Sequence, residues 1–407
     1  MTSTRGSESN GPLSLIYSFP HAIGAPGIGW TAWNQVTELV RAGHRVHLVT
    51  ASVARPIEGL ASLHRTLEVA GARVPHRVIG RDRAFALHDR RGASLVRRIR
   101  PEVVHTWPLA ARRTLEQARL HGAVGLREAP NTHTAHAYRV VAEECALLGV
   151  TLPASASHAT NAAHLAIERA EWRAAHAVLA PSDAVAASFV AEGHDPDRLL
   201  RHQYGYRADP TAPTTRADGG RRFTAVFLGR VEPRKGLHYA LEAWSTSTAS
   251  RGGRFLVYGD VLPGYAEYLE PLLGLPGVEV RPFTSDPAAA LRDADVLVLP
   301  TIEEGSALVT YEAQAVGCIP LVSTAAGALL DDGVHGLLHE PRDVATLRSQ
   351  LDLLHASPQE RHRLSRNAAA HAPELTWERA GAALVEAYRT ALARGAEWKA
   401  HDRAVVG

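Results

Sequence analysis

Short apolar runs alternate with longer amphipathic segments along almost the whole chain. The short runs are apolar at nearly every position, as expected of strands in a parallel sheet that helices cover on both faces. The longer segments, such as Thr31–Ala42 and Arg112–His121, are typical of helices. The predicted strands are Leu13–Phe19, Arg45–Thr50, Val74–Ile79, Val103–Trp107, Val124–Arg127, Val178–Pro181, Thr224–Leu228, Arg254–Tyr258, Val278–Pro282, Val296–Leu299 and Ile319–Ser323. This alternation predicts an α/β protein built on doubly wound parallel sheets.

A stretch of Pro, Gly, Thr and Asp at residues 209–222 interrupts the alternation and is typical of a linker. A chain of 407 residues is also longer than one ordinary core. We therefore predict two Rossmann-like doubly wound domains, residues 1–207 and 208–375, that face each other across a cleft. Because ligands of open α/β sheets bind beyond the carboxyl ends of the strands, functional residues are expected in the loops that follow them.

Composition argues against several classes of function. The formal net charge of +2 gives no electrostatic basis for binding nucleic acid. No apolar run approaches the ~18 residues of a spanning helix, so no integral membrane association is expected. The polar first residues lack the features of a signal peptide, and Cys145 and Cys318 have no metal-ligand spacing. A cytoplasmic protein that requires no metal is the simplest interpretation.

Two cations flank a loop directly after the strand Thr224–Leu228. Arg230 and Lys235 lie in the sequence GRVEPRKG, and a helical pattern follows at once. A pyrophosphate in this loop would meet both charges and the amino end of a helix. Lys235 is one of only two lysines in the chain, which favours a need for a compact point charge. A solvated basic loop is the alternative interpretation.

The sequence PTIEEGSALVTYEA follows the apolar strand Val296–Leu299. Gly305 suits a tight turn before a helix, which leaves backbone N–H groups of Ser306, Ala307 and Leu308 unpaired at the helix start. Such donors bind a diphosphate well. A surface helix with ordinary acidic positions remains the alternative.

Two glutamates in this motif, Glu304 and Glu312, raise the question of a glycosidase acid/base pair. Eight positions along a helix correspond to ~12 Å, longer than the roughly 5–9.5 Å between the two carboxyl groups of glycosidases. Separate roles are the better interpretation: Glu304 is expected to face the sugar of a nucleotide-sugar, and Glu312 its ribose.

A glycine-rich loop, HAIGAPGIGW, follows the first predicted strand. Gly27 and Gly29 permit close approach of the backbone to a ligand. The spacing is not G-x-G-x-x-G, and no acidic residue at the end of the second strand is placed to hold a ribose, which argues against a dehydrogenase. A flexible strand–helix loop is the alternative.

The motifs FLGRVEPRKGL and PTIEEGSALVTYEAQAVGCIPLVS together resemble the donor domain of retaining glycosyltransferases of family 4. The resemblance is strong over residues 223–345 and loose over residues 1–200. It implies the GT-B fold, an acceptor-binding first domain and a donor-binding second domain. It also implies that the C-terminal helix, residues 376–395, packs back on the first domain.

The same resemblance implies roles for individual residues. Arg230 and Lys235 would bind the donor phosphates, and the loop Gly27–Gly29 would approach phosphates and acceptor. Glu304 would contact the donor sugar, and Glu312 the ribose. Further donor-binding residues implied are Arg281, Phe283, Gly305, Ser306, Ala307 and Leu308.

Members of the family usually place a histidine in the cleft after a strand of the first domain. The matching stretch is REAPNTHTAH, in which His133 is preferred to His136 and a structural role is the alternative. Two positions depart from the family pattern. Ser306 and Ala307 stand where Phe is common, so the wall of the sugar pocket differs, and Gln314 stands where Met is common.

The predicted reaction is transfer of a sugar from a UDP- or GDP-sugar to a small polar acceptor with retention, by a front-face mechanism that needs no metal. The nucleotide-sugar is a co-substrate and no cofactor is expected. Arg230 and Lys235 would stabilise charge on the leaving nucleotide. A nucleotide-sugar epimerase, a phosphorylase and a non-catalytic nucleotide-sugar binding protein are the alternatives. The composition suggests specialised-metabolite biosynthesis as one context; base, sugar, acceptor and oligomeric state are not specified by the sequence.

Overall fold

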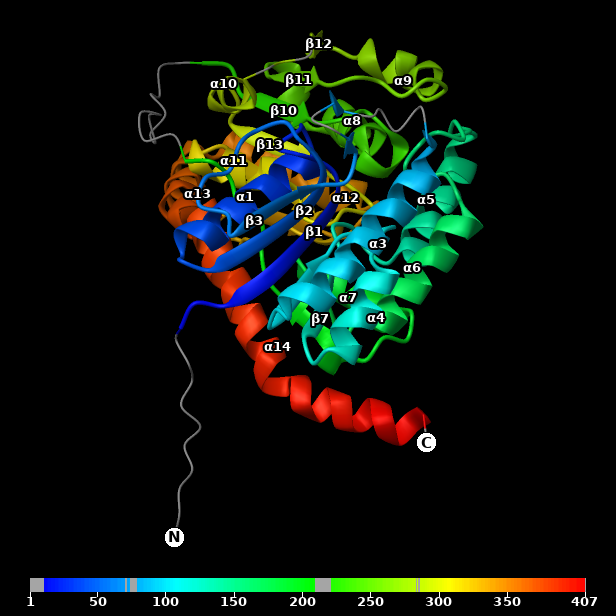
Figure 1. Cartoon of the computed structure of the whole chain (residues 1–407). Coiled ribbons are helices and arrows are strands. Elements are labelled where there is room, and N and C mark those ends of the chain that lie inside the picture. Colours follow the sequence, from blue (N-terminus) through cyan, green and yellow to red (C-terminus); the bar gives the residue numbers. More distant parts are fainter. Residues whose placement is uncertain are drawn as a thin grey trace. The chain divides into compact units, whose positions relative to one another are not determined.

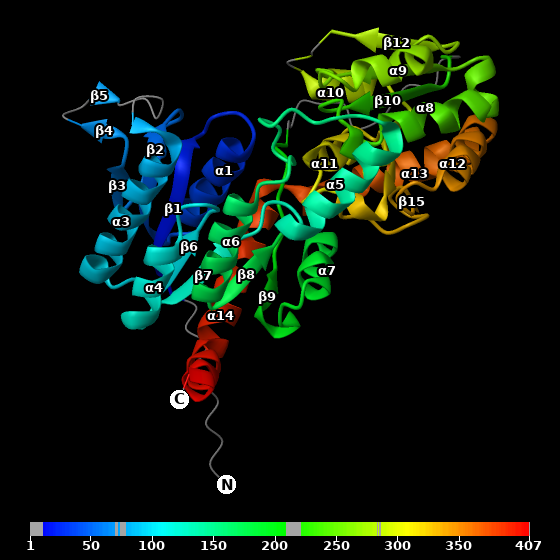
Figure 2. The ribbon, with the colours of Figure 1, turned by 90° about the vertical axis from the view of Figure 1, so that its right-hand side faces the viewer.

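The computed structural model describes residues 11–69, 72–73, 79–208, 221–282, 284 and 286–406. The chain packs into two compact units (Figures 1 and 2). Unit 1 contains residues 1–128, 166–179 and 381–407, and unit 2 contains residues 129–165 and 180–380. The predicted domain division after residue 207 stays a prediction, and most of the predicted linker lies outside the described residues.

Unit 1 is built on a parallel sheet in which the strands lie in the order β3-β2-β1-β6-β7-β8. The chain changes direction across this sheet between β1 and β6, which are direct neighbours. The elements that begin in this part of the chain are β1 (Ser14–Ile23), α1 (Ile28–Arg41), β2 (Arg45–Val53), β3 (Ser62–Arg65), β4 (Glu68–Val69), β5 (Ala72–Arg73), α3 (Arg81–Ile99), β6 (Val103–Thr106), α4 (Arg112–Leu120), β7 (Val124–Glu128) and β8 (Ala177–Ala180).

Helices cover both faces of this sheet, which explains why its central strands carry apolar residues on both sides. On one face, Ile16 and Val104 pack with Leu95 of α3 and Ala118 of α4. The neighbouring residue of β1, Tyr17, points the other way, and its hydroxyl donates to Gln35 of α1 at 2.5 Å. Successive residues of a strand face opposite sides of a sheet, so both sides need apolar cover.

Unit 2 contains a second parallel sheet with the strand order β12-β11-β10-β13-β14-β15. Its strands are β10 (Thr224–Leu228), β11 (Arg254–Tyr258), β12 (Val278–Arg281), β13 (Val296–Leu299), β14 (Ile319–Ser323) and β15 (Leu337–His339), and β9 (Leu199–Arg201) precedes them. Its α-helices are α5 (Thr134–Leu148), α7 (Asp183–Ala191), α8 (Leu237–Thr246), α9 (Ala266–Leu273), α10 (Pro287–Arg292), α11 (Leu308–Ala315), α12 (Val344–Ala356) and α13 (Pro358–His371). Helix α6 (Ala162–Ala174) and helix α14 (Trp377–Val406) each have residues in both units.

Alternate residues of β10 show that this sheet is also covered on both faces. Val226 packs with Leu291 of α10 and Ala313 of α11. Phe227 packs in a second core that includes Leu241 of α8. The strand order reverses between β10 and β13, and such a switch point opens a crevice at the carboxyl ends of the strands. The two predicted phosphate motifs begin at these two strand ends.

Eight of the predicted strands correspond closely to observed ones, and β10, β11, β13 and β14 have the predicted bounds. The fold class, with two parallel-sheet α/β domains, is therefore confirmed. The predicted strand Val74–Ile79 lies almost wholly outside the described residues.

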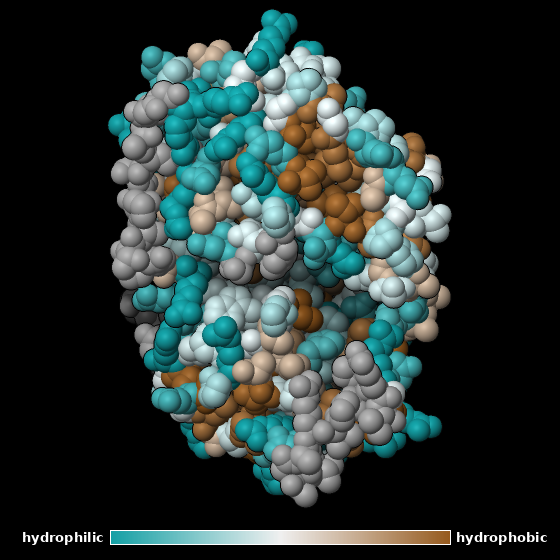
Figure 3. Space-filling model, turned by 90° about the horizontal axis from the view of Figure 1, so that it is seen from above, coloured by the Kyte–Doolittle hydropathy of each residue, from teal (hydrophilic) through white to brown (hydrophobic). Residues whose placement is uncertain are grey.

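Exposed apolar side chains are distributed over both units, among them Leu120, Leu147 and Val280. The face shown in Figure 3 carries mainly hydrophilic residues, with apolar residues gathered in patches. Among the described residues, no helix combines the length and the apolar character needed to cross a bilayer.

Candidate active site

The two predicted phosphate motifs meet in unit 2 through the backbone of Arg234. Its carbonyl oxygen accepts a hydrogen bond from the N–H of Ile302 and another from the hydroxyl of Thr301, both at 2.8 Å. Arg234 lies in a short 3-10 helix, η2 (Pro233–Lys235), that leads into α8. The loop after β10 is thereby fastened to the loop after β13.

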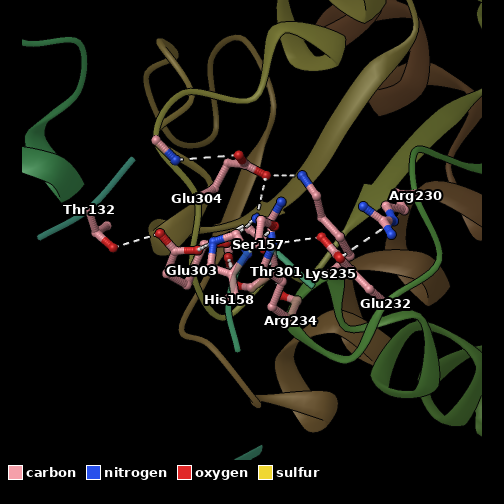
Figure 4. Close-up of polar contacts among 12 residues, drawn as sticks. Thr132, Ser157, His158, Arg230, Glu232, Arg234, Lys235, Thr301, Glu303 and Glu304 are labelled. Atoms are coloured by element: carbon pink, nitrogen blue, oxygen red, sulfur yellow. Dashed lines mark hydrogen bonds and ion pairs between the residues drawn. The ribbon is translucent and has the colours of Figure 1, made fainter. Parts of the chain in front are cut away.

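The side chain of Arg234 lies among three carboxylates (Figure 4). Its Nε is 2.7 Å from Glu232, and its Nη1 is 3.1 Å from Glu304 and 3.6 Å from Glu303. Nη1 also donates to the backbone carbonyl of Glu303 at 2.9 Å. A guanidinium group with several planar donors suits such a cluster, which a single ammonium group could not serve in the same way.

Lys235 and Glu304 form an ion pair beside this cluster. Both side chains are nearly buried. Burial, together with the neighbouring charge of Arg234, lowers the pKa of Lys235 to about 7. The sequence predicted that both residues bind the donor, and the structure brings them together at the carboxyl ends of β10 and β13.

Glu303 is fully buried and ties a distant segment of unit 2 to the motif. Its carboxylate accepts from the hydroxyl of Thr132 at 2.6 Å and lies 3.1 Å from Nε2 of His158. Burial alone would raise the pKa of Glu303. The hydrogen bond with His158, the charge of Arg234 and the hydrogen bond from Thr132 outweigh it and hold this pKa well below the usual range.

Arg230 lines a cavity of about 470 Å³ at the ends of β10 and β11. The cavity is also lined by Gly229, Tyr258, Asp260 and Pro263, among others. The guanidinium group of Arg230 is about half exposed, and its Nε lies 3.8 Å from Glu232. This loose contact leaves its donors available to a ligand in the cavity.

The amino end of α11 offers some of the predicted backbone donors. In the described part of the chain, the N–H groups of Ser306 and Leu308 have no hydrogen-bond partner. The prediction that the N–H group of Ala307 is unpaired is wrong, because this group donates to the carbonyl oxygen of Ala326 at 3.1 Å. The turn η4 (Thr324–Ala326) after β14 packs against the loop and occupies that donor.

Glu312 lies on α11 and is only partly exposed. Within the described residues its carboxylate has no hydrogen-bond or ion-pair partner. Burial raises the pKa of Glu312 to about 7. A largely buried carboxylate without a protein partner is unusual, and a ligand hydroxyl would supply a hydrogen bond.

Gly305 is needed for close packing within unit 2. A Cβ atom at this position would lie 1.9 Å from the carbonyl oxygen of Pro130. Its own carbonyl oxygen accepts a hydrogen bond from the hydroxyl of Ser182 at 2.5 Å. The motif is thus held against two other segments of the unit.

The predicted glycines of unit 1 lie at the start of α1, after β1. Gly27 is the residue before the helix and has a φ of 76°, which favours glycine. A Cβ atom at Gly29 would lie 2.5 Å from the carbonyl oxygen of Ala22, so this position also requires glycine. Their predicted contact with phosphates and acceptor stays a prediction.

His133 is buried in unit 2, where its side chain has a structural function. Its Nδ1 accepts the N–H of Ala135 at 3.2 Å and so caps α5. Its ring contacts the rings of Phe189 and His194. His136, the second choice, is half-buried, and burial and the charge of Arg139 lower its pKa. A catalytic role of His133 stays a prediction.

Arg281 lies at the end of β12, where its exposed side chain pairs with Glu279. The structure shows no contact between Arg281 and the cavity beside Arg230. Phe283 lies outside the described residues. The predicted nucleobase contacts of both therefore stay predictions. Among the described residues, no group of His, Cys, Asp and Glu side chains is arranged to hold a metal ion.

Sequence reasoning missed four residues of this site: Thr132, His158, Arg234 and Glu303. Arg234 and Glu303 lie inside the two motifs, directly beside Lys235 and Glu304, but no feature of the sequence indicates a role for them. Thr132 and His158 each lie about 150 or more positions before Glu303 in the sequence, so no local pattern connects them to it.

Comparison with known proteins finds a family match for the segment that carries both phosphate motifs. Residues 222–357 match the sequence model of a family described as glycosyl transferases group 1. The D-inositol 3-phosphate glycosyltransferase of Geodermatophilus obscurus is 34% identical over 243 residues, 53% of this chain and 52% of that protein. The one of Saccharomonospora viridis is 33% identical over 239 residues, 55% of this chain and 47% of that protein. The chain spans about half the length of these curated relatives.

Solved structures show the same fold. HepE from Anabaena in complex with UDP aligns with a TM-score of 0.61 and 15% identity, over 92% of this chain and 99% of that one. Sucrose-phosphate synthase from Thermosynechococcus elongatus aligns with a TM-score of 0.64 and 18% identity, over 93% and 99%. The lipopolysaccharide glycosyltransferase WaaG aligns with a TM-score of 0.59 and 16% identity, over 91% and 99%. These likenesses identify the fold as GT-B, and the resemblance to glycosyltransferases is confirmed.

Proposed function

We propose, from the premise that residues 222–357 form a glycosyltransferase group 1 domain, that this protein is a retaining glycosyltransferase. It transfers a sugar from a nucleoside diphosphate sugar to a small polar acceptor. The observation that carries the proposal is the convergence of Lys235, Glu304 and Arg234 at the switch point of the second sheet. The amino end of α11, where the N–H groups of Ser306 and Leu308 have no hydrogen-bond partner in the described residues, follows a few residues further along the same loop.

The donor phosphates are expected between Lys235, Arg230 and the N–H groups of Ser306 and Leu308. The two N–H groups are fixed by the fold before the donor arrives, so they stabilise the charge of the leaving nucleoside diphosphate without reorganisation. In the free protein Lys235 is paired with Glu304. Donor binding would redirect the ammonium group to a phosphate and leave Glu304 for the sugar hydroxyls.

The remaining parts of the donor follow from the site. The ribose hydroxyls would donate to Glu312, which has no other partner in the described residues. The cavity beside Arg230 has room for a nucleobase. UDP is the nucleotide to test first, because HepE structures contain UDP and UDP-glucose.

The proposed reaction needs no covalent enzyme intermediate. The bond between the anomeric carbon and the phosphate oxygen breaks, and the nucleoside diphosphate leaves with the electron pair. The acceptor oxygen attacks from the same face, and its proton passes to the departing phosphate oxygen. Electrostatic stabilisation of the leaving group is then the main catalytic contribution, and one lost donor costs roughly 10²–10³ in rate.

The test is an assay of UDP release from UDP-sugars with a panel of polar acceptors, D-inositol 3-phosphate among them, followed by determination of the anomeric configuration of the product. We expect acceptor-dependent release of UDP and a product of unchanged configuration. An inverted product would contradict the retaining mechanism. Conversion of the donor alone would indicate an epimerase, a requirement for inorganic phosphate would indicate a phosphorylase, and binding without release would indicate a binding protein.

A further inference from the structure

Helix α3 of unit 1 carries a row of exposed arginines along one side. When the helix is viewed along its axis, at 100° per residue, five of its six arginines fall within an arc of about 120°, together with one leucine and one serine. The row extends over roughly 22 Å at 1.5 Å per residue. We call this surface the arginine stripe; its residues are Arg83, Leu87, Arg90, Arg91, Ser94, Arg97 and Arg98, and all are exposed.

The fold fixes the stripe on the outside of unit 1. The opposite side of α3 packs against the sheet through Leu95 and Val96, which are buried in the core. Gly92 lies so close to α4 that a Cβ atom there would be 2.5 Å from Oγ1 of Thr114. Figures 1 and 2 show α3 and α4 side by side. The helix therefore cannot turn to bury its arginines.

The charge of the stripe is not compensated within the described residues. None of its five guanidinium groups has a carboxylate partner there. Asp89 of the same helix is buried and accepts from the backbone N–H groups of Arg113 and Thr114 instead. With six arginines and two aspartates, α3 has a formal charge of +4, whereas the whole chain has +2. The rest of the chain is thus slightly acidic, and the positive charge is local.

The positive potential reaches the neighbouring edge strand β3. His64 of that strand is partly buried, and its burial together with the charges of Arg91 and Arg98 lowers its pKa. The guanidinium groups of the stripe therefore act on their surroundings as a group of unpaired charges.

Apolar side chains accompany the stripe. Leu87 lies in its middle and is 47% exposed. Leu120 at the end of α4 is 72% exposed. It lies beside the carboxyl end of α3, because Arg100 contacts Nδ1 of its neighbour His121 at 2.7 Å. Exposed leucine next to arginine is the combination that a lipid interface accommodates.

We propose that the arginine stripe docks unit 1 on the surface of an anionic phospholipid bilayer. The arginines would bind lipid phosphates with paired donors, and Leu87 would enter the interface. A straight stripe on one helix matches a flat surface, and nucleic acid offers no apolar layer for the leucines. The inference does not depend on the proposed function, because the stripe shares no residue with the candidate active site.

Co-sedimentation of the full chain with vesicles tests the proposal. We expect binding to vesicles of phosphatidylcholine and phosphatidylglycerol in equal parts, little binding to phosphatidylcholine alone, and loss of binding at high salt. An arginine near an anionic surface contributes about fivefold in affinity. Arg90→Gln with Arg91→Gln should therefore weaken binding roughly 25-fold. Leu87→Asn should weaken it severalfold.

A matched control removes the same charge elsewhere. Arg363 and Arg366 are exposed on α13, and their double substitution by Gln should leave vesicle binding within about twofold if the stripe acts locally. An equal loss in both double variants would overturn the proposal in favour of a net-charge effect. Failure to bind the anionic vesicles, or tighter binding to duplex DNA or polyglutamate than to vesicles, would overturn it as well.

Discussion

Arg234 illustrates at the residue scale how a motif residue that was given no role can set the geometry of its neighbours Lys235 and Glu304. It contacts Glu304 at 3.1 Å while its backbone joins the loops after β10 and β13. Lys235 can turn to a phosphate only if Glu304 keeps another positive partner, because an uncompensated buried carboxylate is costly. Arg234 supplies that partner and is therefore a positioning residue.

We predict that Arg234→Lys keeps the protein folded but lowers kcat of sugar transfer by up to about 10²-fold, because an ammonium group cannot hold three carboxylates and Glu304 moves. Affinity for UDP should change little. Arg251→Lys, at an exposed position, is the control. A variant with unchanged kcat would show that Arg234 has no positioning role.

Glu312 gives a pH-dependent prediction. Its folded-state pKa of about 7 lies above its ordinary value of 4.5. The folded protein thus binds more protons than the unfolded chain between these values, and stability falls as the pH rises through this window. Glu312→Gln removes that loss. We expect the free energy of unfolding of the variant to equal that of wild type below about pH 4. Near about pH 8 we expect it to exceed the wild-type value by up to about 3 kcal/mol.

Urea unfolding at several pH values measures this difference. Glu242→Gln on α8, an exposed position, is the control and should follow wild type at every pH. A stability difference between Glu312→Gln and wild type that stays constant with pH would rule out the raised pKa. Calorimetry should in addition show weaker UDP binding to the variant, since the ribose loses its acceptor.

At the residue scale, the sequence supports predictions where the chemistry is local. Lys235 and Glu304 were named from their motifs, and the structure places them in contact, while their binding of the donor stays a prediction. Their mutual contact was not predicted, because residues almost 70 positions apart meet only through the strand order. The backbone N–H group of Ala307 was wrongly predicted to be unpaired, because the residue that accepts its hydrogen bond, Ala326, lies in the connection after β14. His133 was chosen by position alone, whereas its capping contact depends on the exact start of α5.

At the scale of elements, strands with continuous apolar runs were predicted well, as β10 and β13 show. Strand β1 extends beyond Phe19 to Ile23 through a register shift in its pairing with β2, which no periodic pattern indicates. β9 and β15 have only three residues each, too few for a recognisable period.

The close approach of Gly305 to Pro130 predicts the effect of one added methyl group. With Cβ 1.9 Å from a backbone carbonyl oxygen, relief requires a shift of the backbone in one of two packed segments. We expect Gly305→Ala to destabilise unit 2 by at least about 1–3 kcal/mol and to abolish most transfer activity. Gly252→Ala is the matched control, since no heavy atom lies within 4 Å of its Cβ position. Urea unfolding that finds both variants alike would contradict the packing.

At the scale of the whole molecule, the two units are interleaved along the chain. Local composition cannot indicate this, because the contacts responsible join distant residues. Glu144 of α5, for example, binds His238 and Arg342 at 2.8 Å each and so holds residues 129–165 within unit 2. The last helix joins unit 1 from residue 381 on.

Tyr388 anchors this last helix in the core of unit 1. Its hydroxyl lies 2.6 Å from Nδ1 of His105, and both side chains are fully buried. Tyr388→Phe keeps the ring and removes the hydroxyl, so we expect a loss of about 1–3 kcal/mol in the free energy of unfolding of unit 1. Tyr268→Phe, with a ring 39% exposed, should cost less than about 0.5 kcal/mol. Chemical unfolding of the two variants compares them, and equal stability would argue against the anchor.

Binding of nucleotide should act on one unit more than on the other, because the described donor residues other than Gly27 and Gly29 belong to unit 2. UDP at a hundredfold excess over its Kd stabilises the folded state by about 2.7 kcal/mol. Differential scanning calorimetry should therefore show UDP raising one unfolding transition, whereas Tyr388→Phe lowers the other. Lys235→Ala should remove most of the UDP shift without lowering the transition of unit 1. If UDP instead raises the transition that Tyr388→Phe lowers, the nucleotide binds through unit 1, and the assignment of the phosphates to Lys235 and the amino end of α11 fails.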